Sequence, residues 1–135
     1  MIEFMYREER LSTSGTILRP VAKVYLPKED DQWVAEYFYV DSGADYTLIP
    51  YRLGHFLGLD RRSESEVRDI GGIGGVIGTR RVNRPMKIGD HTFPCELAWA
   101  QVERVPLLLG REGVFDHFDV TFQQTERKIV FQWRG

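Results

Sequence analysis

The sequence holds a single cysteine, Cys95, among its 135 residues. One cysteine excludes an intramolecular disulfide framework and any zinc site built from several thiolates. Long apolar runs are also missing, since the best one, Leu107–Leu109, is far below the roughly 20 residues that a membrane-spanning helix needs. The first ten residues carry acidic side chains and lack the apolar stretch of a signal peptide. We therefore expect a soluble, cytoplasmic protein with no membrane partner.

Neither sign of charge is in excess, because 18 Lys and Arg side chains stand against 20 Asp and Glu. The resulting net charge of −2 gives no electrostatic footprint for nucleic acid, which we do not expect as a partner. The 3 histidines show no metal-ligand spacing, so the sequence predicts no metal site and no cofactor. With 42% hydrophobic and 28% charged residues, the composition is typical of one globular domain.

Short stretches rich in β-branched and aromatic residues recur along the chain, with turn residues about every ten positions. The predicted strands are 21–26, 33–40, 47–49, 66–70, 76–82, 86–88, 93–100, 107–109, 118–122 and 128–133. Short helical segments are predicted at 51–59, with Gly58 as a candidate stop, and at 113–117. Residues 1–15 are charged and show little periodicity, so we interpret them as an N-terminal extension to a single domain of residues 16–135. The pattern indicates a mostly-β barrel or sandwich.

The first chemically informative stretch is Asp41-Ser42-Gly43-Ala44-Asp45, which directly follows the apolar strand 33–40. It places a carboxylate where the backbone turns sharply. Ser42 can form local hydrogen bonds, and Gly43 lets other groups approach the backbone closely. A bare Asp-Ser-Gly is also typical of an ordinary turn at the end of a strand, so this motif alone does not decide the function.

A second stretch has four glycines, Gly71, Gly72, Gly74 and Gly75, around Ile73. Because extended segments flank it, we predict a hairpin tip whose backbone amides are open to a ligand. A plain surface hairpin is the simpler alternative. A phosphate-binding loop is disfavoured, since the Lys-Ser/Thr ending and the Gly-x-Gly-x-x-Gly spacing are both missing.

The third stretch is the apolar run Leu107–Leu109 followed by Gly110 and Arg111. An apolar run ending at glycine indicates a buried strand that passes close to another backbone. Arg111 stands where it could meet an acid, although a solvated charge after a core strand is equally compatible with the pattern.

Taken together and in this order, the three stretches resemble the retropepsin-like aspartic proteases, the single-domain relatives of the retroviral enzymes. The family pattern is an apolar strand leading into Asp-Thr/Ser-Gly-Ala, then a glycine-rich flap, then an apolar pair before Gly and often Arg. The resemblance extends from about residue 16 to the C-terminus. It implies a mostly-β, closed acid-protease barrel with one or two short helices and a β-hairpin flap.

The resemblance also implies an aspartic endopeptidase that is active as a homodimer. Each chain of such an enzyme supplies one catalytic aspartate, here Asp41, and this sequence has only one Asp-Ser-Gly. Two facing carboxylates share one proton, so one activates a water molecule while the other donates a proton to the peptide carbonyl. The partners expected are a second copy of the chain and a peptide or protein substrate. The alternative is a catalytically weak or silent peptide-binding scaffold with the same fold.

Residue roles follow from the same resemblance. Asp41 would be the catalytic acid, with Ser42 bonding across the dimer and Gly43 offering its carbonyl to the substrate. Arg111 would pair with Asp45, and Gly110 would support the site. Ala44 replaces a hydroxyl residue found in many two-lobed relatives, which predicts a pH optimum nearer neutral. The expected substrate-binding residues are Ala44, Asp45, Leu48, Gly71, Gly72, Ile73, Gly74, Gly75 and Ile77, although Leu48 and Ile77 could equally fill the core.

Overall fold

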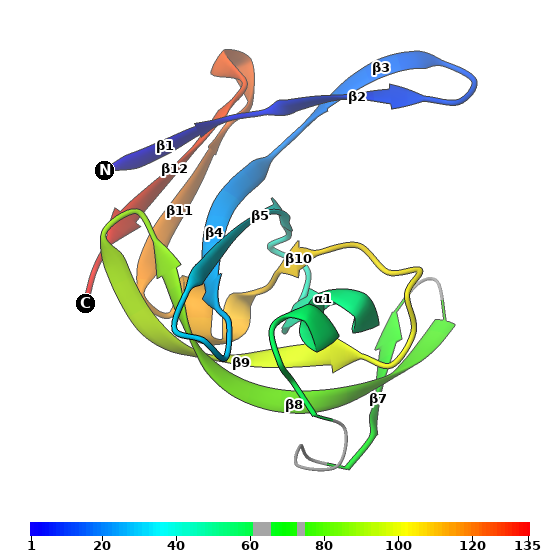
Figure 1. The fold of residues 1–135 in the computed structure, drawn as a ribbon. Helices are drawn as coiled ribbons and strands as arrows, with labels where there is room; N and C mark the ends of the chain where they lie inside the picture. The colour runs from blue at the N-terminus through cyan, green and yellow to red at the C-terminus, as the bar shows by residue number, and fades with distance from the viewer. Residues whose placement is uncertain (61–65, 73–74) are drawn as a thin grey trace.

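The computed structural model describes residues 1–60, 66–72 and 75–135, and its main feature is a closed barrel of six strands (Figure 1). Around the barrel the strands are β4 (Val21–Pro27), β5 (Trp33–Val40), β10 (Leu108–Leu109), β6 (Thr47–Ile49), β9 (His91–Ala100) and β8 (Gly75–Ile88). The pairing of Tyr25 on β4 with Lys87 on β8 closes the ring. The predicted mostly-β acid-protease barrel is therefore confirmed.

The short strand β10 lies between the two strands that flank the Asp-Ser-Gly loop. It runs parallel to β5, with Leu109 opposite Val40, and antiparallel to β6, with Leu108 opposite Leu48. The chain therefore inserts β10 between β5 and β6 in the barrel wall and places the third sequence motif directly beside the first. This arrangement determines the geometry of the candidate site.

A hairpin formed by β7 (Arg68–Gly72) and the first part of β8 extends from the barrel, with Gly72 opposite Gly75. The prediction of separate strands at 76–82 and 86–88 is wrong, because β8 runs unbroken from Gly75 to Ile88. Pro85, which lacks an amide hydrogen, lies within this strand. Pro85 faces Pro94 on β9, and alternate pairs in an antiparallel ladder exchange no hydrogen bonds, so two facing prolines fit there.

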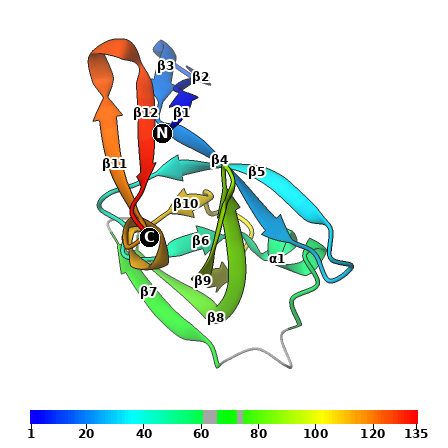
Figure 2. The same ribbon diagram turned by 90° about the vertical axis from the view of Figure 1, so that its left-hand side faces the viewer.

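Two smaller sheets complete the described chain (Figure 2). The strands β1 (Ile2–Met5), β12 (Lys128–Trp133) and β11 (Phe118–Gln123) form one of them, and β2 (Arg7–Leu11) pairs only with β3 (Gly15–Arg19) in the other. Sequence analysis missed β1, β2 and β3. The partner of β1 lies at the far end of the chain, and the charged β2 has no apolar face whose periodicity could reveal a strand. The proposed boundary between residues 15 and 16 falls inside β3, and the division into extension and domain stays a prediction.

The helix α1 (Tyr51–Phe56) packs tightly on the barrel. A side chain at Gly54 would overlap the Trp99 indole, whose Nε1 donates a hydrogen bond of 3.0 Å to the Tyr51 carbonyl. The helix is shorter than the predicted 51–59, and Gly58 follows its end with a φ of +91°. The left-handed backbone there is typical of a glycine that terminates a helix, as predicted.

The core joins the barrel to the C-terminal sheet. Phe38 and Trp99 from the barrel and Ile129 and Phe131 from β12 are fully buried in one hydrophobic cluster. Two short helical turns, η1 (Arg111–Phe115) and η2 (Gln124–Glu126), connect the surrounding strands, and η1 begins two residues before the predicted 113–117. In the described part of the chain, no helix is long and apolar enough to cross a membrane.

Candidate active site

The Asp41 carboxylate is fixed at the start of a tight turn. Its backbone amide donates to the Leu109 carbonyl at 3.1 Å, and its own carbonyl accepts the Ala44 amide at 3.2 Å. The Oδ1 atom accepts the Gly43 amide at 2.9 Å. Asp41 is half-buried, whereas Ser42 and Gly43 are exposed. The turn therefore orients the carboxylate while leaving the adjacent backbone open to a second molecule.

The second half of the loop is bonded to the backbone that follows β10. The Arg111 amide donates to the Ala44 carbonyl at 2.9 Å, and the Glu112 amide donates to the Asp45 carbonyl at 2.8 Å. The predicted ion pair is also present, with Arg111 Nη2 at 2.5 Å from Asp45 Oδ1. The side chains of Arg111 and Asp45 are 56% and 63% exposed, so this pair lies at the surface of the site.

The segment of the third motif approaches the chain at the end of the Asp41 loop most closely at Gly110. A Cβ at this position would overlap the backbone carbonyl of Tyr46. The Gly110 amide donates a buried hydrogen bond of 3.1 Å to Thr47 Oγ1, and Thr47 is fully buried. The sequence prediction that the strand passes close to another backbone at this glycine is therefore confirmed, and the contact places β10 against the Asp41 loop.

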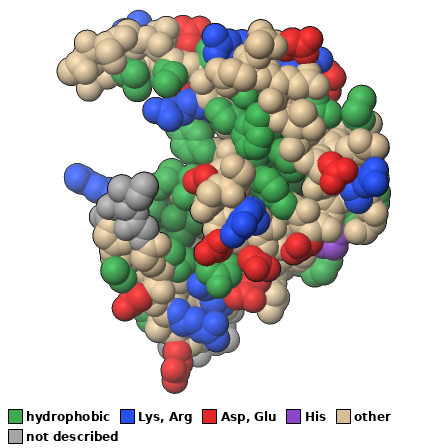
Figure 3. Space-filling view, turned by 180° about the vertical axis from the view of Figure 1, so that it is seen from behind, with side chains coloured by type: hydrophobic (Ala, Val, Ile, Leu, Met, Phe, Trp, Pro, Cys, Tyr) green, Lys and Arg blue, Asp and Glu red, His purple; other side chains and the backbone are tan. Residues whose placement is uncertain are grey.

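A pocket of about 480 Å³ opens beside Asp41. Figure 3 shows a hollow on this molecule, with hydrophobic side chains on its inner wall, between the β2–β3 hairpin and the β7–β8 hairpin. The pocket walls are largely apolar, with charged groups from the N-terminal hairpin. Its lining residues are Glu9, Arg19, Pro20, Tyr39, Val40, Asp41, Pro106 and Leu108.

A charged cluster around Tyr39 forms one side of this pocket. The Tyr39 hydroxyl donates to Glu9 Oε2 at 2.6 Å, and Glu9 also pairs with Arg7 at 2.8 Å and Arg19 at 3.1 Å. Both guanidinium groups lie over the Tyr39 ring, at 5.4 Å and 6.0 Å from its centroid. The hydrogen bond from Tyr39, with support from the arginines, lowers the pKa of Glu9, and the same hydrogen bond raises the pKa of Tyr39.

The predicted flap residues fall on the β7–β8 hairpin. Gly71 and Gly75 are exposed near its end, and Gly72 pairs with Gly75. Ile73 and Gly74 lie outside the described residues. The structure contains the hairpin, and its closure over a substrate stays a prediction.

A small hydrophobic cluster connects this hairpin to the Asp41 loop. Leu48 is 7% exposed and packs with Ile70 and Ile77 of the hairpin and with Leu108 of β10. Leu48 and Ile77 therefore both belong to a hydrophobic cluster at the base of the hairpin. Their contact with a substrate stays a prediction.

Sequence analysis missed most of the residues that line the pocket. Tyr39 could have been found, because side chains two positions apart on an extended chain point to the same side and Tyr39 precedes Asp41 by two. Glu9 had no local signal, since it is 30 residues from Tyr39 in the sequence. Within the described ranges, no three His, Cys, Asp or Glu side chains are grouped as metal ligands.

A family model described as aspartyl protease matches residues 34–112, which is more than half of the chain. The chain belongs to the retropepsin-like aspartyl protease family. The span that matches this protease family contains all three sequence motifs and the barrel strands from β5 to β10. It leaves out the β2–β3 hairpin, which supplies Glu9 and Arg19 to the pocket. No curated protein matches the chain at a significant level.

Proposed function

We propose that this protein is an aspartic endopeptidase that hydrolyses peptide bonds as a homodimer, with Asp41 of each copy in the active site. The observation that carries the proposal is the Asp41 carboxylate itself. It is oriented by the Gly43 amide and by the backbone of β10, and it opens into a pocket of about 480 Å³. A side chain held in this way beside an apolar pocket suits a group that acts on a bound peptide.

The second copy is required because one chain supplies one such aspartate. A two-fold axis beside the exposed Ser42 and Gly43 would bring the two Asp41 carboxylates together through an isologous interface. The β7–β8 hairpin of each copy would then close over the substrate as a flap. The Asp45–Arg111 pair, at the exposed edge of the loop, would meet the substrate backbone.

Two facing carboxylates share one proton, because like charges at hydrogen-bond distance do not both ionise easily. The ionised carboxylate would accept a proton from a water molecule while the water oxygen bonds to the peptide carbonyl carbon. The protonated carboxyl would donate its proton to the carbonyl oxygen. Transfer of a proton to the amide nitrogen then allows the C–N bond to break, with no covalent enzyme intermediate.

The test is digestion of a peptide library by the wild type and by Asp41→Asn at several protein concentrations. We expect cleavage by the wild type, loss of cleavage in Asp41→Asn, and a specific activity that rises with protein concentration. Asp90→Asn is the matched control, since Asp90 is an exposed aspartate in the β8–β9 turn, and it should cleave like the wild type. Equal cleavage by the wild type and Asp41→Asn would indicate a contaminant. A folded dimer without cleavage would indicate a peptide-binding scaffold.

The pH–rate profile tests the role of Ala44. Because Ala44 has no hydroxyl to donate to the carboxylates, we expect an optimum nearer neutral than in two-lobed relatives and a shift to lower pH in Ala44→Thr. An optimum below about pH 3 in the wild type would contradict this proposal.

A further inference from the structure

The β2–β3 hairpin has no partner strand in the described part of its own chain. Its register runs from Arg7 opposite Arg19 to Leu11 opposite Gly15, and its end lies beyond the barrel (Figure 1). An isolated two-stranded hairpin is only marginally stable in water. Ile17 and Leu18 are nevertheless 39% and 37% exposed. We propose that this hairpin is an arm that grips the second copy of the chain, an inference that rests on the proposed homodimer.

The base of the arm is rigidly attached beside Asp41. Glu9 on β2 receives the Tyr39 hydrogen bond at 2.6 Å from β5, the strand that ends at the Asp41 loop. The ion pair of Glu9 with Arg19 joins β2 to β3 at the same point. The orientation of the arm is therefore set before a second copy binds, which reduces the entropy lost on association.

The position of this base indicates that the arm would contact the second copy of the chain. Glu9 and Arg19 line the same pocket as Asp41. A two-fold axis that brings two Asp41 carboxylates together would also bring the second copy close to this pocket, and so to the base of the arm. Ile17 and Leu18 lie at this base, opposite Glu9 and Glu8, where they would contact that copy, and the rest of the hairpin would then extend along its surface.

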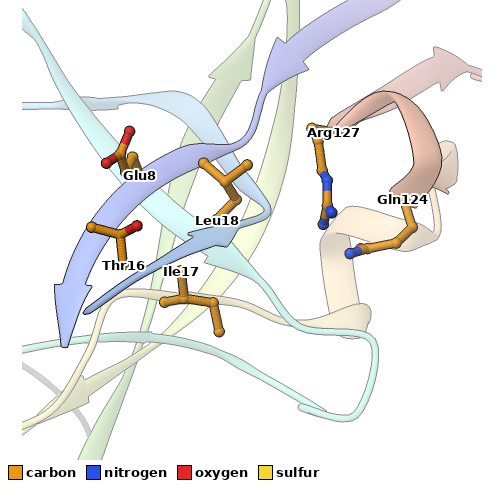
Figure 4. Close-up of a pocket in the computed structure, with 6 residues that line it drawn as sticks. All are labelled: Glu8, Thr16, Ile17, Leu18, Gln124 and Arg127. Carbon is orange, nitrogen blue, oxygen red and sulfur yellow. The ribbon is translucent and has the colours of Figure 1, made fainter. Parts of the chain in front are cut away.

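A second hollow lies beside the arm, on the side where we expect the second copy to bind. A space of about 570 Å³ separates the hairpin from the turn between β11 and β12. In Figure 4 the Gln124 and Arg127 side chains extend from that turn into the gap, across from β3. The hollow combines the apolar Ile17 and Leu18 with one acid, Glu8, and one base, Arg127. This mixed lining suits a protein segment of balanced charge, as in this chain with its net charge of −2, rather than a polyanion.

The experiment compares dimerisation of the wild type with that of the double variant Ile17→Asp/Leu18→Asp by sedimentation equilibrium. Both side chains are partly exposed, so circular dichroism should show a folded monomer, while the dimer dissociation constant should rise by at least about tenfold. The control is Phe56→Asp on α1, where the residue is 55% exposed and the new carboxylate would face Lys28. This control should dimerise like the wild type. An unchanged dissociation constant in the double variant would overturn the proposal, as would a wild type that is monomeric at every concentration.

A second measurement needs no disruptive substitution. Protein that carries a nitroxide label on Ser14→Cys, in the turn at the end of the arm, is mixed with ¹⁵N protein that carries no nitroxide. Cys95 is buried and does not compete for the label. Broadened amide signals in the ¹⁵N copy support an arm that crosses to its partner, and unbroadened signals in a mixed dimer overturn it. A dimer that depends on the arm but shows no Asp41-dependent cleavage would support the arm and reject the endopeptidase. Cleavage by an arm-independent dimer would do the reverse.

Discussion

The Tyr39 hydroxyl lies 2.6 Å from Glu9 Oε2 and donates a hydrogen bond to it. This contact attaches the strand that ends at Asp41 to a hairpin outside the segment that matches the aspartyl protease family. The charged side of the Asp41 pocket is thus built by the contact between these two segments, and changes at Tyr39 or Glu9 should affect both stability and the site.

Tyr39→Phe removes the hydrogen bond and should lower the free energy of unfolding by about 1–2 kcal/mol near neutral pH. The Tyr39 hydrogen bond is the largest cause of the lowered pKa of Glu9, whose ordinary value is 4.5. A lowered carboxyl pKa stabilises the folded state above the unfolded value, and this contribution is lost as the pH falls through the folded pKa. Urea unfolding between about pH 7 and pH 3 should therefore show a weaker loss of stability in Tyr39→Phe than in the wild type.

Glu9→Gln is the matched control for this titration, since it keeps the shape of the side chain and removes its charge change. Its stability should vary least with acidification among the three proteins. Equal pH dependence in the wild type and Glu9→Gln would mean that Glu9 does not contribute, and the interpretation of the cluster would be wrong.

Gly110→Ala should be strongly destabilising, because the new methyl group would overlap the Tyr46 carbonyl, a backbone atom that cannot rotate away. We expect a loss of about 1–3 kcal/mol or more in the free energy of unfolding, together with displacement of β10 from the Asp41 loop. Gly71→Ala is the control for stability, since a Cβ there has no neighbour within 4 Å. Thermal unfolding of both variants checks the prediction, and similar melting temperatures would contradict it.

Arg111→Gln should separate function from stability. Both partners of the Asp45–Arg111 pair are more than half exposed, so its loss should change the free energy of unfolding by less than about 1 kcal/mol. The peptide KM should rise, because Asp45 loses the side chain that orients it. Arg134→Gln removes the exposed Arg134–Asp119 pair and should leave KM unchanged. A rise in KM for both variants, or for neither, would argue against a role for Arg111 at the site.

The sequence was most informative where one face of a strand is buried. The strand 33–40 and the final strand 128–133 match the structure residue for residue, because apolar and aromatic side chains mark them as extended and buried. The hairpin formed by β2 and β3 was missed because neither strand has a fully buried residue, so no apolar periodicity marks it. A tertiary pairing cannot be inferred from local pattern.

The site likewise contains some residues that the sequence could bring together and others that only the fold brings together. Asp45 and Arg111 are 66 residues apart, and only the resemblance to the protease family placed them together. The insertion of β10 between β5 and β6 makes that contact possible, and this insertion depends on the whole barrel. Glu9 and Tyr39 lacked such a guide, because the family pattern does not include the hairpin.

The last prediction concerns Cys95, which is 2% exposed and lies close to Gly113 behind the turn that follows Arg111. Burial raises the pKa of its thiol to about 12, from an ordinary value of 9.0. The thiolate is the reactive form, so the folded protein should resist iodoacetamide near neutral pH, whereas protein unfolded in urea should react at the rate of a free cysteine. Rapid labelling of the folded protein would contradict the buried position.

The same pKa makes stability depend on alkaline pH. Above the unfolded value of 9.0 the unfolded chain releases the thiol proton while the folded chain keeps it, so stability falls as the pH rises toward about 12. The loss approaches about 1.4 kcal/mol for each pH unit in this range. Tyrosines and lysines also titrate there, and Cys95→Ala is therefore measured beside the wild type. Above about pH 9, the free energy of unfolding should fall faster in the wild type than in Cys95→Ala. Parallel curves of the free energy of unfolding against pH would mean that the thiol has the same protonation in the folded and unfolded states, and would contradict the prediction.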